Sequence, residues 1–162
     1  MISIEGLKKI LLLQNLTDKM LEKMLPLTEA RQYKERDLVY EEGEKAVNFY
    51  MLNRGKILLE VELSEMIIIS LGSIKTAYSF GWSSLIPGSS HTNYAVCTEP
   101  CEVFAIPGES FLGLLNEDHT MGFLVMQGVM RVLQGRLERR TGQFLKVMSR
   151  HPEIGKLLGY GA

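Results

Sequence analysis

The fold is decided by the stretch NFYMLNRGKILLEVEL, residues 48–63. It opens with a largely apolar run and continues through a turn that contains Gly55. From Ile57 to Leu63, every second side chain is apolar. Such alternation is typical of a strand with one buried face. The stretch therefore predicts two strands joined by a glycine turn.

Further strand candidates lie on both sides of this stretch. Leu38–Tyr40 precedes it, and Tyr94–Cys97 and Val103–Ile106 follow it. The continuous apolar run in Met66–Leu71 predicts a short buried strand. Several short strands separated by turn residues are typical of a β-sandwich or a β-barrel.

Apolar residues at helical spacing occur both before and after the predicted strands. Residues 4–31 carry apolar side chains at helical spacing in two runs, and Thr17 is expected to cap the second run. After the last strand, Glu109–Leu115 predicts a short helix. A long helix is predicted from about Asp118 to Ser149 because its apolar positions keep one spacing throughout.

This long helix carries an apolar seam whose members lie alternately three and four residues apart. A heptad pattern of this kind predicts that the helix pairs with another helix, although packing on the helix's own domain is an open alternative. The seam consists of Phe123, Met126, Met130, Leu133, Leu137 and Phe144, with Arg140 in one position.

The composition is that of one ordinary globular domain. The 162 residues carry 18 Lys and Arg against 19 Asp and Glu, so a broad basic face for nucleic acid is not expected. No apolar run approaches the roughly 20 residues that cross a bilayer, and no signal peptide is evident. We therefore expect a cytoplasmic protein without a membrane partner. Standard catalytic motifs are absent from the sequence, so an enzyme is not expected.

Metal chemistry has little support in the sequence. Cys97 and Cys101 are too few for a disulfide framework and are not spaced like common metal pairs. We interpret them as small apolar residues on or beside a strand. The three histidines form no ligand pattern either, so no metal site is predicted.

Four segments resemble the cyclic-nucleotide-binding domain family, and most closely the sensor domain of bacterial catabolite-activator-type regulators. Leu38–Glu44 resembles the family's entry strand and turn, and Phe49–Ile57 resembles its strand–Gly–strand signature. Ser79–Leu85 stands where the family has its phosphate-binding cassette, and Cys101–Ile106 resembles the strand that follows. The resemblance implies an α+β, mainly β fold: an eight-stranded jelly-roll β-barrel with N-terminal helices and a long C-terminal dimer helix.

The resemblance also implies a division of the chain. Residues 1–118 would form the jelly roll with its N-terminal helices, residues 119–150 the dimerisation helix, and residues 151–162 a tail. A winged helix that reads DNA is not expected after residue 150, because too few residues remain for it. Direct DNA binding by this chain is therefore not expected.

The cassette departs from the family pattern in its charged residues. Gly81 is retained, so a tight turn is expected at this position. Trp82, however, stands where the family has a Glu for the ribose, and His91 stands where it has an Arg for the phosphate. Such an Arg pairs with the phosphate through two charge-assisted hydrogen bonds. His91 would be cationic only below about pH 6.5. The candidate ligand-binding residues are Gly81, Trp82, Ser83, Ser84, His91, Thr92, Asn93 and Arg136, the last either reaching the pocket or solvated.

Three hypotheses follow. The first is a stand-alone ligand-sensing regulatory module that binds a cyclic nucleotide or another small ligand through a degenerate cassette and signals through its long helix. The second is a dimerisation and interaction module, with a protein partner, whose pocket is plugged by Trp82. The third is a haem or metal sensor that would use His91, Cys97 and Cys101. No cofactor is assigned with certainty.

Overall fold

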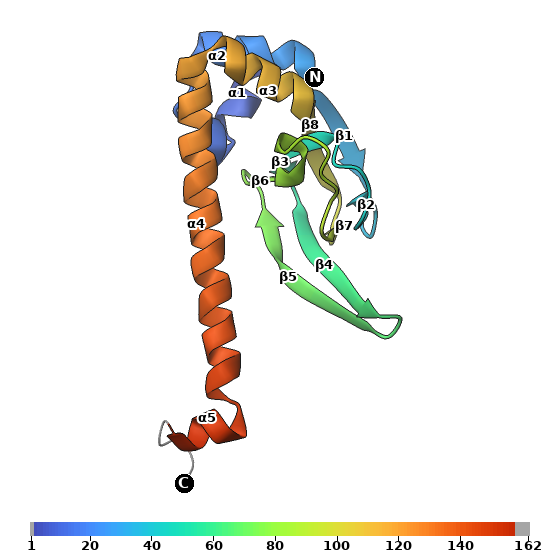
Figure 1. Ribbon diagram of the computed structural model, residues 1–162. Coiled ribbons are helices and arrows are strands. Elements are labelled where there is room, and N and C mark those ends of the chain that lie inside the picture. Colours follow the sequence, from blue (N-terminus) through green and yellow to red (C-terminus); the bar gives the residue numbers. More distant parts are fainter. Residues whose placement is uncertain (1, 158–162) are drawn as a thin grey trace. The chain divides into compact units, whose positions relative to one another are not determined.

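The computed structural model describes residues 2–157. Eight strands form two four-stranded antiparallel sheets (Figure 1). One sheet has the order β1-β8-β3-β6 and the other β2-β7-β4-β5, which confirms the predicted eight-stranded jelly-roll fold. The strands are β1 (Glu29–Tyr33), β2 (Leu38–Tyr40), β3 (Asn48–Arg54), β4 (Lys56–Ser64), β5 (Ile67–Lys75), β6 (Ser79–Phe80), β7 (Tyr94–Cys97) and β8 (Cys101–Pro107).

The glycine turn of the fold-deciding stretch joins the two sheets, since β3 belongs to one sheet and β4 to the other. Gly55 has a φ of 103°, a conformation that side chains disfavour. A Cβ atom at this position would also lie 2.5 Å from Sγ of Cys101 and 2.9 Å from the carbonyl oxygen of Pro100. Glycine is therefore required here by both conformation and packing.

The barrel core lies between the two sheets. Its side chains come from inward-facing positions of both sheets, so alternation along each strand decides which residues are buried. The buried core residues are Val39, Tyr40, Tyr50, Leu52, Ile57, Leu59, Ile74, Phe80, Ala95, Cys97, Cys101, Val103 and Ala105.

The N-terminal helices end earlier than the sequence analysis predicts. Thr17 caps the second helix as expected, because its hydroxyl accepts a hydrogen bond from the backbone N–H of Met20 (3.4 Å). However, residues 29–31 belong to β1, so the predicted helix limit at residue 31 is wrong. Antiparallel pairing with β8 holds them extended, and local periodicity cannot reveal such a partner. The helices here are α1 (Ile4–Lys8), α2 (Asp18–Met24) and the 3₁₀ turns η1 (Leu11–Leu13) and η2 (Leu25–Leu27).

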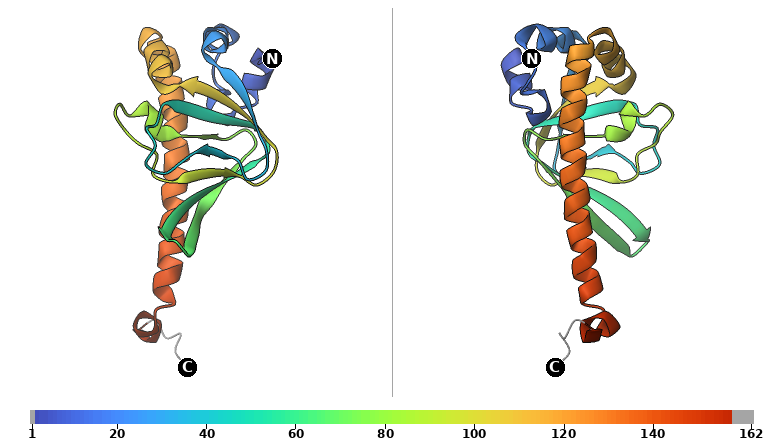
Figure 2. Two further views of the ribbon diagram at one scale, coloured as in Figure 1. Left: turned by 90° about the vertical axis from the view of Figure 1, so that its right-hand side faces the viewer. Right: turned by 60° about the vertical axis from the view of Figure 1, so that its left-hand side comes forward.

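The hairpin formed by β4 and β5 extends beyond the other strands of the sheets (Figure 2). The predicted strand at Met66–Leu71 exists, but the prediction that it is buried is wrong, because Met66 to Ile69 are all exposed. Met66 has 93% of its surface accessible. An apolar run fixes the extended conformation, but burial depends on whether another element reaches this part of the hairpin.

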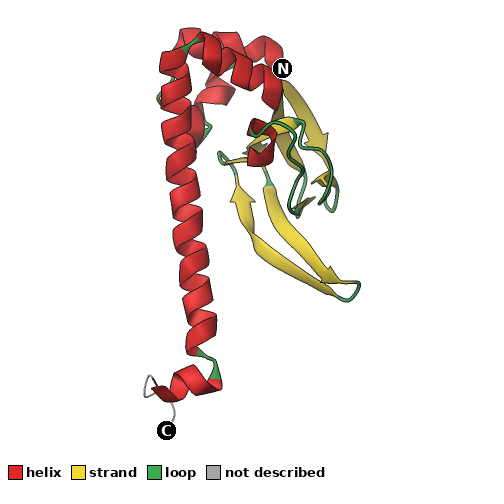
Figure 3. Cartoon of the chain, in the orientation of Figure 1, coloured by secondary structure: helices red, strands yellow, loops and turns green. Residues whose placement is uncertain are grey.

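After the last strand, the described chain continues in helices joined by short connections (Figure 3). They are α3 (Gly108–Glu117), α4 (His119–Ser149) and α5 (Pro152–Leu157). The predicted tail at residues 151–162 thus contains a short helix, and its last five residues lie outside the described part. Among the described helices, none has the length and apolar character needed to cross a membrane.

The chain divides into two compact units, Met1–Val125 and Met126–Ala162. The boundary falls within α4, so the first unit holds the barrel, α1 to α3 and the start of α4. The α4 N-terminus is fixed by Asp118, whose Oδ1 accepts a hydrogen bond from the backbone N–H of Met121 (3.0 Å) and whose Oδ2 forms an ion pair with Lys23 on α2 (2.9 Å). The Lys23 ammonium and the Met121 N–H lower the pKa of the Asp118 carboxyl.

Candidate functional site

The cassette contains a glycine in the left-handed conformation. Gly81 has a φ of 75° and lies between β6 and the 3₁₀ turn η3 (Trp82–Leu85). A Cβ atom on Gly81 would lie 2.7 Å from Cδ2 of Tyr50, so a side chain here would collide with the barrel core. The hydroxyl of Ser84 donates a hydrogen bond to the carbonyl oxygen of Gly81 (2.8 Å), which closes the turn. The tight turn expected from the sequence is therefore present.

Trp82 packs on the outer side of the barrel sheet. Its ring lies edge-on to Phe49, with the ring centroids 5.0 Å apart. Phe49 in turn stacks on Phe111 of α3, with the centroids 5.5 Å apart. Phe49 alternates along β3 with Tyr50, which belongs to the barrel core. The indole thus lies toward α3, and this position does not favour the hypothesis that Trp82 plugs the barrel.

Four other aromatic side chains pack together in the barrel core. The His91 ring stacks on Tyr40, with centroids 3.6 Å apart and planes 7° apart. Tyr40 also lies 5.8 Å from Tyr50 and 6.1 Å from Phe80, and the rings of Tyr50 and Phe80 stack at 5.3 Å. We call these four residues the aromatic cluster. The sequence analysis did not select Tyr40, Tyr50 and Phe80, although alternation within β2 and β3 was a signal for inward-facing rings.

His91 is a core residue and not a solvated loop residue. Only 4% of its surface is accessible. The turn between β2 and β3 holds its backbone: its N–H donates to the carbonyl oxygen of Glu44 (2.8 Å), and its carbonyl accepts from the N–H of Gly43 (2.8 Å). Burial lowers the pKa of the imidazole below its ordinary value of 6.5, and the nearby Glu44 carboxylate opposes this shift only in part. A cationic His91 therefore requires a pH below this ordinary value, because charging a buried ring is unfavourable.

This burial makes folding stability depend on pH. The unfolded chain takes up a proton on His91 near pH 6.5, and the folded chain does so only at lower pH. The free energy of unfolding should therefore be constant above about pH 7 and fall as the pH drops below 6.5, by up to about 1.4 kcal/mol per pH unit. Urea unfolding between pH 7.5 and 5.5 measures this slope. His91→Phe should flatten it, whereas His119→Gln at an exposed position should leave it unchanged. Equal slopes in wild type and His91→Phe would contradict the assignment.

Of the remaining candidate ligand-binding residues, only some lie next to one another. The Tyr40 hydroxyl donates to Oδ1 of Asn93 (3.3 Å), and Nδ2 of Asn93 donates to Oγ1 of Thr92 (3.4 Å), so these residues adjoin the aromatic cluster. Ser83 is half-buried in η3. Arg136 belongs to α4 in the second unit, and its approach to the pocket remains a prediction.

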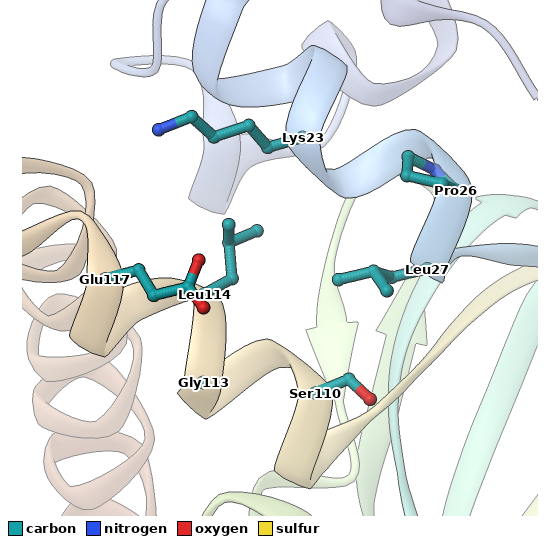
Figure 4. A pocket seen from close by; sticks show the side chains of 7 residues that line it. All are labelled: Lys23, Pro26, Leu27, Ser110, Gly113, Leu114 and Glu117. Carbon is teal, nitrogen blue, oxygen red and sulfur yellow. The ribbon is translucent and has the colours of Figure 1, made fainter.

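Two surface pockets lie beside α3. Side chains of α2, η2 and α3 line the first, with Lys23 and Glu117 as its charged residues (Figure 4). The second lies between the cassette and α3. Of the predicted site residues, Ser84 lines this second pocket, together with Lys45 and Glu109. The backbone of Lys45 pairs with that of Ser90, so this lysine provides a cation beside the cassette.

The cysteines behave as core residues. Both are buried and unpaired by a disulfide. Burial, and next the hydrogen bond with Cys101, raise the pKa of the Cys97 thiol to about 12, so it is a neutral thiol near pH 7. Within residues 2–157, no group of three or more His, Cys, Asp or Glu side chains is placed to hold a metal ion. The haem or metal hypothesis gains no support from this arrangement.

The predicted seam on α4 is exposed along its length. Within the described residues, its large side chains are left exposed, with accessible fractions between 40% and 67%. Contiguous exposed apolar side chains are typical of protein–protein interaction surfaces. The exposed seam residues are Phe123, Met126, Met130, Leu133, Leu137 and Phe144.

Comparison with solved structures identifies similar folds. A protein described as a cyclic nucleotide-binding protein from Geobacter metallireducens is 26% identical, with a TM-score of 0.74 over 85% of this chain and 99% of that chain. The sensor domain of the transcriptional regulator DNR from Pseudomonas aeruginosa (17% identity, TM-score 0.69) covers 83% of this chain and 90% of its own. The catabolite activator protein of Thermus thermophilus (22% identity, TM-score 0.69) covers 85% and 62%.

Sequence comparison agrees with the structural one. Among curated proteins, no sequence matches the chain significantly. The family model for the cyclic nucleotide-binding domain, however, matches residues 30–118, more than half of the chain. The match spans β1 to α3, including the cassette and the aromatic cluster. The chain therefore belongs to the cyclic nucleotide-binding domain family.

Proposed function

We propose that this chain is a homodimeric regulatory module whose cassette binds cyclic nucleotides weakly or not at all and whose output passes through α4. The observation that carries the proposal is the stack of His91 on Tyr40 in the barrel core. By the resemblance of the cassette, His91 stands where the family has its phosphate-binding Arg. The jelly roll would act as the sensor part and the long helix as the dimerisation part. A non-enzymatic regulatory role fits the family.

The electrostatics at the cassette oppose a cyclic phosphate. His91 is held neutral by burial, and the Glu44 carboxylate lies near enough to influence its titration. Loss of a charge-assisted pair removes about 1.5–3 kcal/mol, and loss of the carboxylate that Trp82 replaces leaves a ribose hydroxyl unpaired at about 1–3 kcal/mol. Together these losses weaken binding a hundredfold or more, at about 1.4 kcal/mol per tenfold.

This function has two alternative forms, and both are proposals. In the first, a small ligand other than a cyclic nucleotide displaces part of the aromatic cluster. In the second, the module binds no ligand and serves for dimerisation and interaction with a protein partner. The packing of Trp82 on Phe49 supports a modified form of the second proposal. In this form, the aromatic cluster occupies the barrel core in place of Trp82.

Calorimetric titration with cyclic AMP and cyclic GMP tests the loss of nucleotide binding. We expect little or no binding by the wild type, because the pairing groups are missing and the site is filled. Trp82→Glu combined with His91→Arg should increase the affinity, since it restores both charged groups. A matched control, Ile86→Glu combined with His119→Arg, places the same charges at exposed positions and should have no effect.

Two results would count against the proposal. Micromolar or tighter binding of either nucleotide by the wild type would show that the cassette works without its charged residues. No gain from the double variant, in a protein that circular dichroism shows to be folded, would mean that Trp82 and His91 do not occupy the family's ligand positions.

A further inference from the structure

A surface pocket of about 630 Å³ lies between α3 and the segment that follows the cassette, and we call it the α3 pocket. A volume of this order is typical of sites that hold a small molecule. Residues 45–47, before β3, and residues 86–88, after η3, form two of its walls. The third wall is α3, where four lining residues have the i, i+3, i+4, i+7 spacing of one helix face. These four residues are Glu109, Leu112, Gly113 and Asn116.

Backbone contacts hold the three walls of the α3 pocket together. The N–H of Gly108, the first residue of α3, donates a hydrogen bond to the carbonyl oxygen of Val47 (2.8 Å), and the N–H of Ala46 donates one to the carbonyl oxygen of Ser89 (3.0 Å). The helix also packs directly on η3, since a Cβ atom on Gly108 would collide with the carbonyl group of Ser84. The shape of the pocket therefore depends on backbone that is fixed before any ligand binds.

Two glycines in the lining leave the α3 pocket open. A Cβ atom on Gly88 or on Gly113 would meet no atom from another part of the chain within 4 Å. Gly88 has a φ of 77°, so the turn itself requires a glycine there. Gly113 lies inside α3, where a glycine is less favourable than an alanine. The space beside Gly113 is thus available to a ligand at a position where the helix alone favours a side chain.

The lining of the α3 pocket is mainly apolar but includes one charged residue of each sign. Lys45 comes from the wall before β3, and Glu109 comes from α3. Within residues 2–157, neither side chain takes part in an ion pair. Both charges are therefore available to a ligand. The apolar lining residues are Ala46, Val47, Ile86, Pro87, Pro107 and Leu112.

We propose that the α3 pocket binds a small zwitterion with an apolar body, such as an amino acid with an aliphatic side chain. The ligand carboxylate would pair with the Lys45 ammonium, and the ligand ammonium with the Glu109 carboxylate. The aliphatic part would lie on the apolar lining. A phosphate-bearing ligand is disfavoured, because Glu109 would repel it. The lining residues are not part of the barrel core, so the inference depends neither on the loss of nucleotide binding nor on the dimer.

Proton–nitrogen correlation NMR tests this binding, with L-leucine as the probe. The backbone signals of Gly88 and Gly113 belong to the lining and should shift in a saturable way, whereas the signal of Gly72 on β5 should not move. N-acetyl-L-leucine keeps only the carboxylate, and L-leucinamide keeps only the ammonium. Each should bind about tenfold more weakly than leucine, because one charge-assisted pair is lost.

Two charge variants identify the partners of the ligand. Lys45→Met should abolish the difference in affinity between leucine and leucinamide, because the ligand carboxylate then has no partner. Glu109→Gln should abolish the difference between leucine and N-acetyl-leucine. As matched controls, Lys75→Met and Glu99→Gln make the same changes at exposed positions outside the pocket, and should leave both differences unchanged.

A third variant, Gly113→Leu, blocks the pocket. The backbone leaves room for this side chain, so the variant should keep its spectrum elsewhere and lose the leucine-induced shift of Gly88. Three results would overturn the proposal. The first is that neither Gly88 nor Gly113 shifts in the wild type up to the solubility limit of leucine. The second is equal affinity for leucine and its two singly charged analogues. The third is a shift of Gly88 that survives Gly113→Leu, since binding would then lie elsewhere.

Discussion

Leu133→Asp should leave the protein monomeric. Leu133 lies in the middle of the exposed seam on α4 and is 47% accessible in the single chain. In a helix pair, two copies of this leucine would be buried, each stabilising the dimer by about 1.5–3 kcal/mol. Aspartates in their place would face one another in an apolar seam. The dimer dissociation constant should therefore rise at least about a hundredfold. Light scattering over a range of protein concentrations measures the change.

A matched variant tests whether the position or the charge is responsible. Gln134→Asp places the same carboxylate one residue further along, about 100° away from the seam on an exposed part of the helix. It should leave the dimer nearly unchanged. Both variants should keep the unfolding transition of the barrel, because its core lies in the first unit. A wild-type protein that remains monomeric at every concentration would refute the seam interpretation.

Phe49→Ala should destabilise the barrel by about 3–5 kcal/mol. Phe49 is fully buried and contacts Trp82 on η3 and Phe111 on α3, so its ring holds the cassette and the helix to the same sheet. Removing the ring leaves a cavity that these rigid elements cannot fill. Trp82 is the only tryptophan of the chain, so its fluorescence reports this contact directly. Urea unfolding followed by Trp82 emission gives the loss in free energy.

Ile86→Ala is the control for this experiment. Ile86 directly follows the cassette but is 62% accessible, so its truncation should change the free energy of unfolding by less than about 0.5 kcal/mol. Native-state emission should shift to longer wavelength in Phe49→Ala, because water gains access to the indole, and should remain unshifted in Ile86→Ala. If the two variants were equally stable, Trp82 would not be packed on Phe49 as described.

Much of the cassette could be predicted from its sequence, because its geometry depends on local chemistry. Gly81 was identified as a turn residue, and its positive φ and close approach to Tyr50 explain why a glycine is needed. The roles of Trp82 and His91 could not be predicted. Both are aromatic, and nothing in a linear pattern tells which of them enters the barrel. The structure turns Trp82 outward toward α3 and His91 inward onto Tyr40.

By itself, the sequence determined the order of the elements and the family. Alternation from Ile57 to Leu63, the Gly55 turn and the three-four spacing on α4 are local signals, since each depends on the backbone geometry of a single segment. Only the tertiary structure decided which apolar surfaces are covered. Residues 29–31 leave the predicted helix because β8 pairs with them, and the apolar run at Met66–Leu71 stays exposed because the hairpin extends beyond the sheets. Burial depends on what else reaches a segment, and a linear pattern does not contain that information.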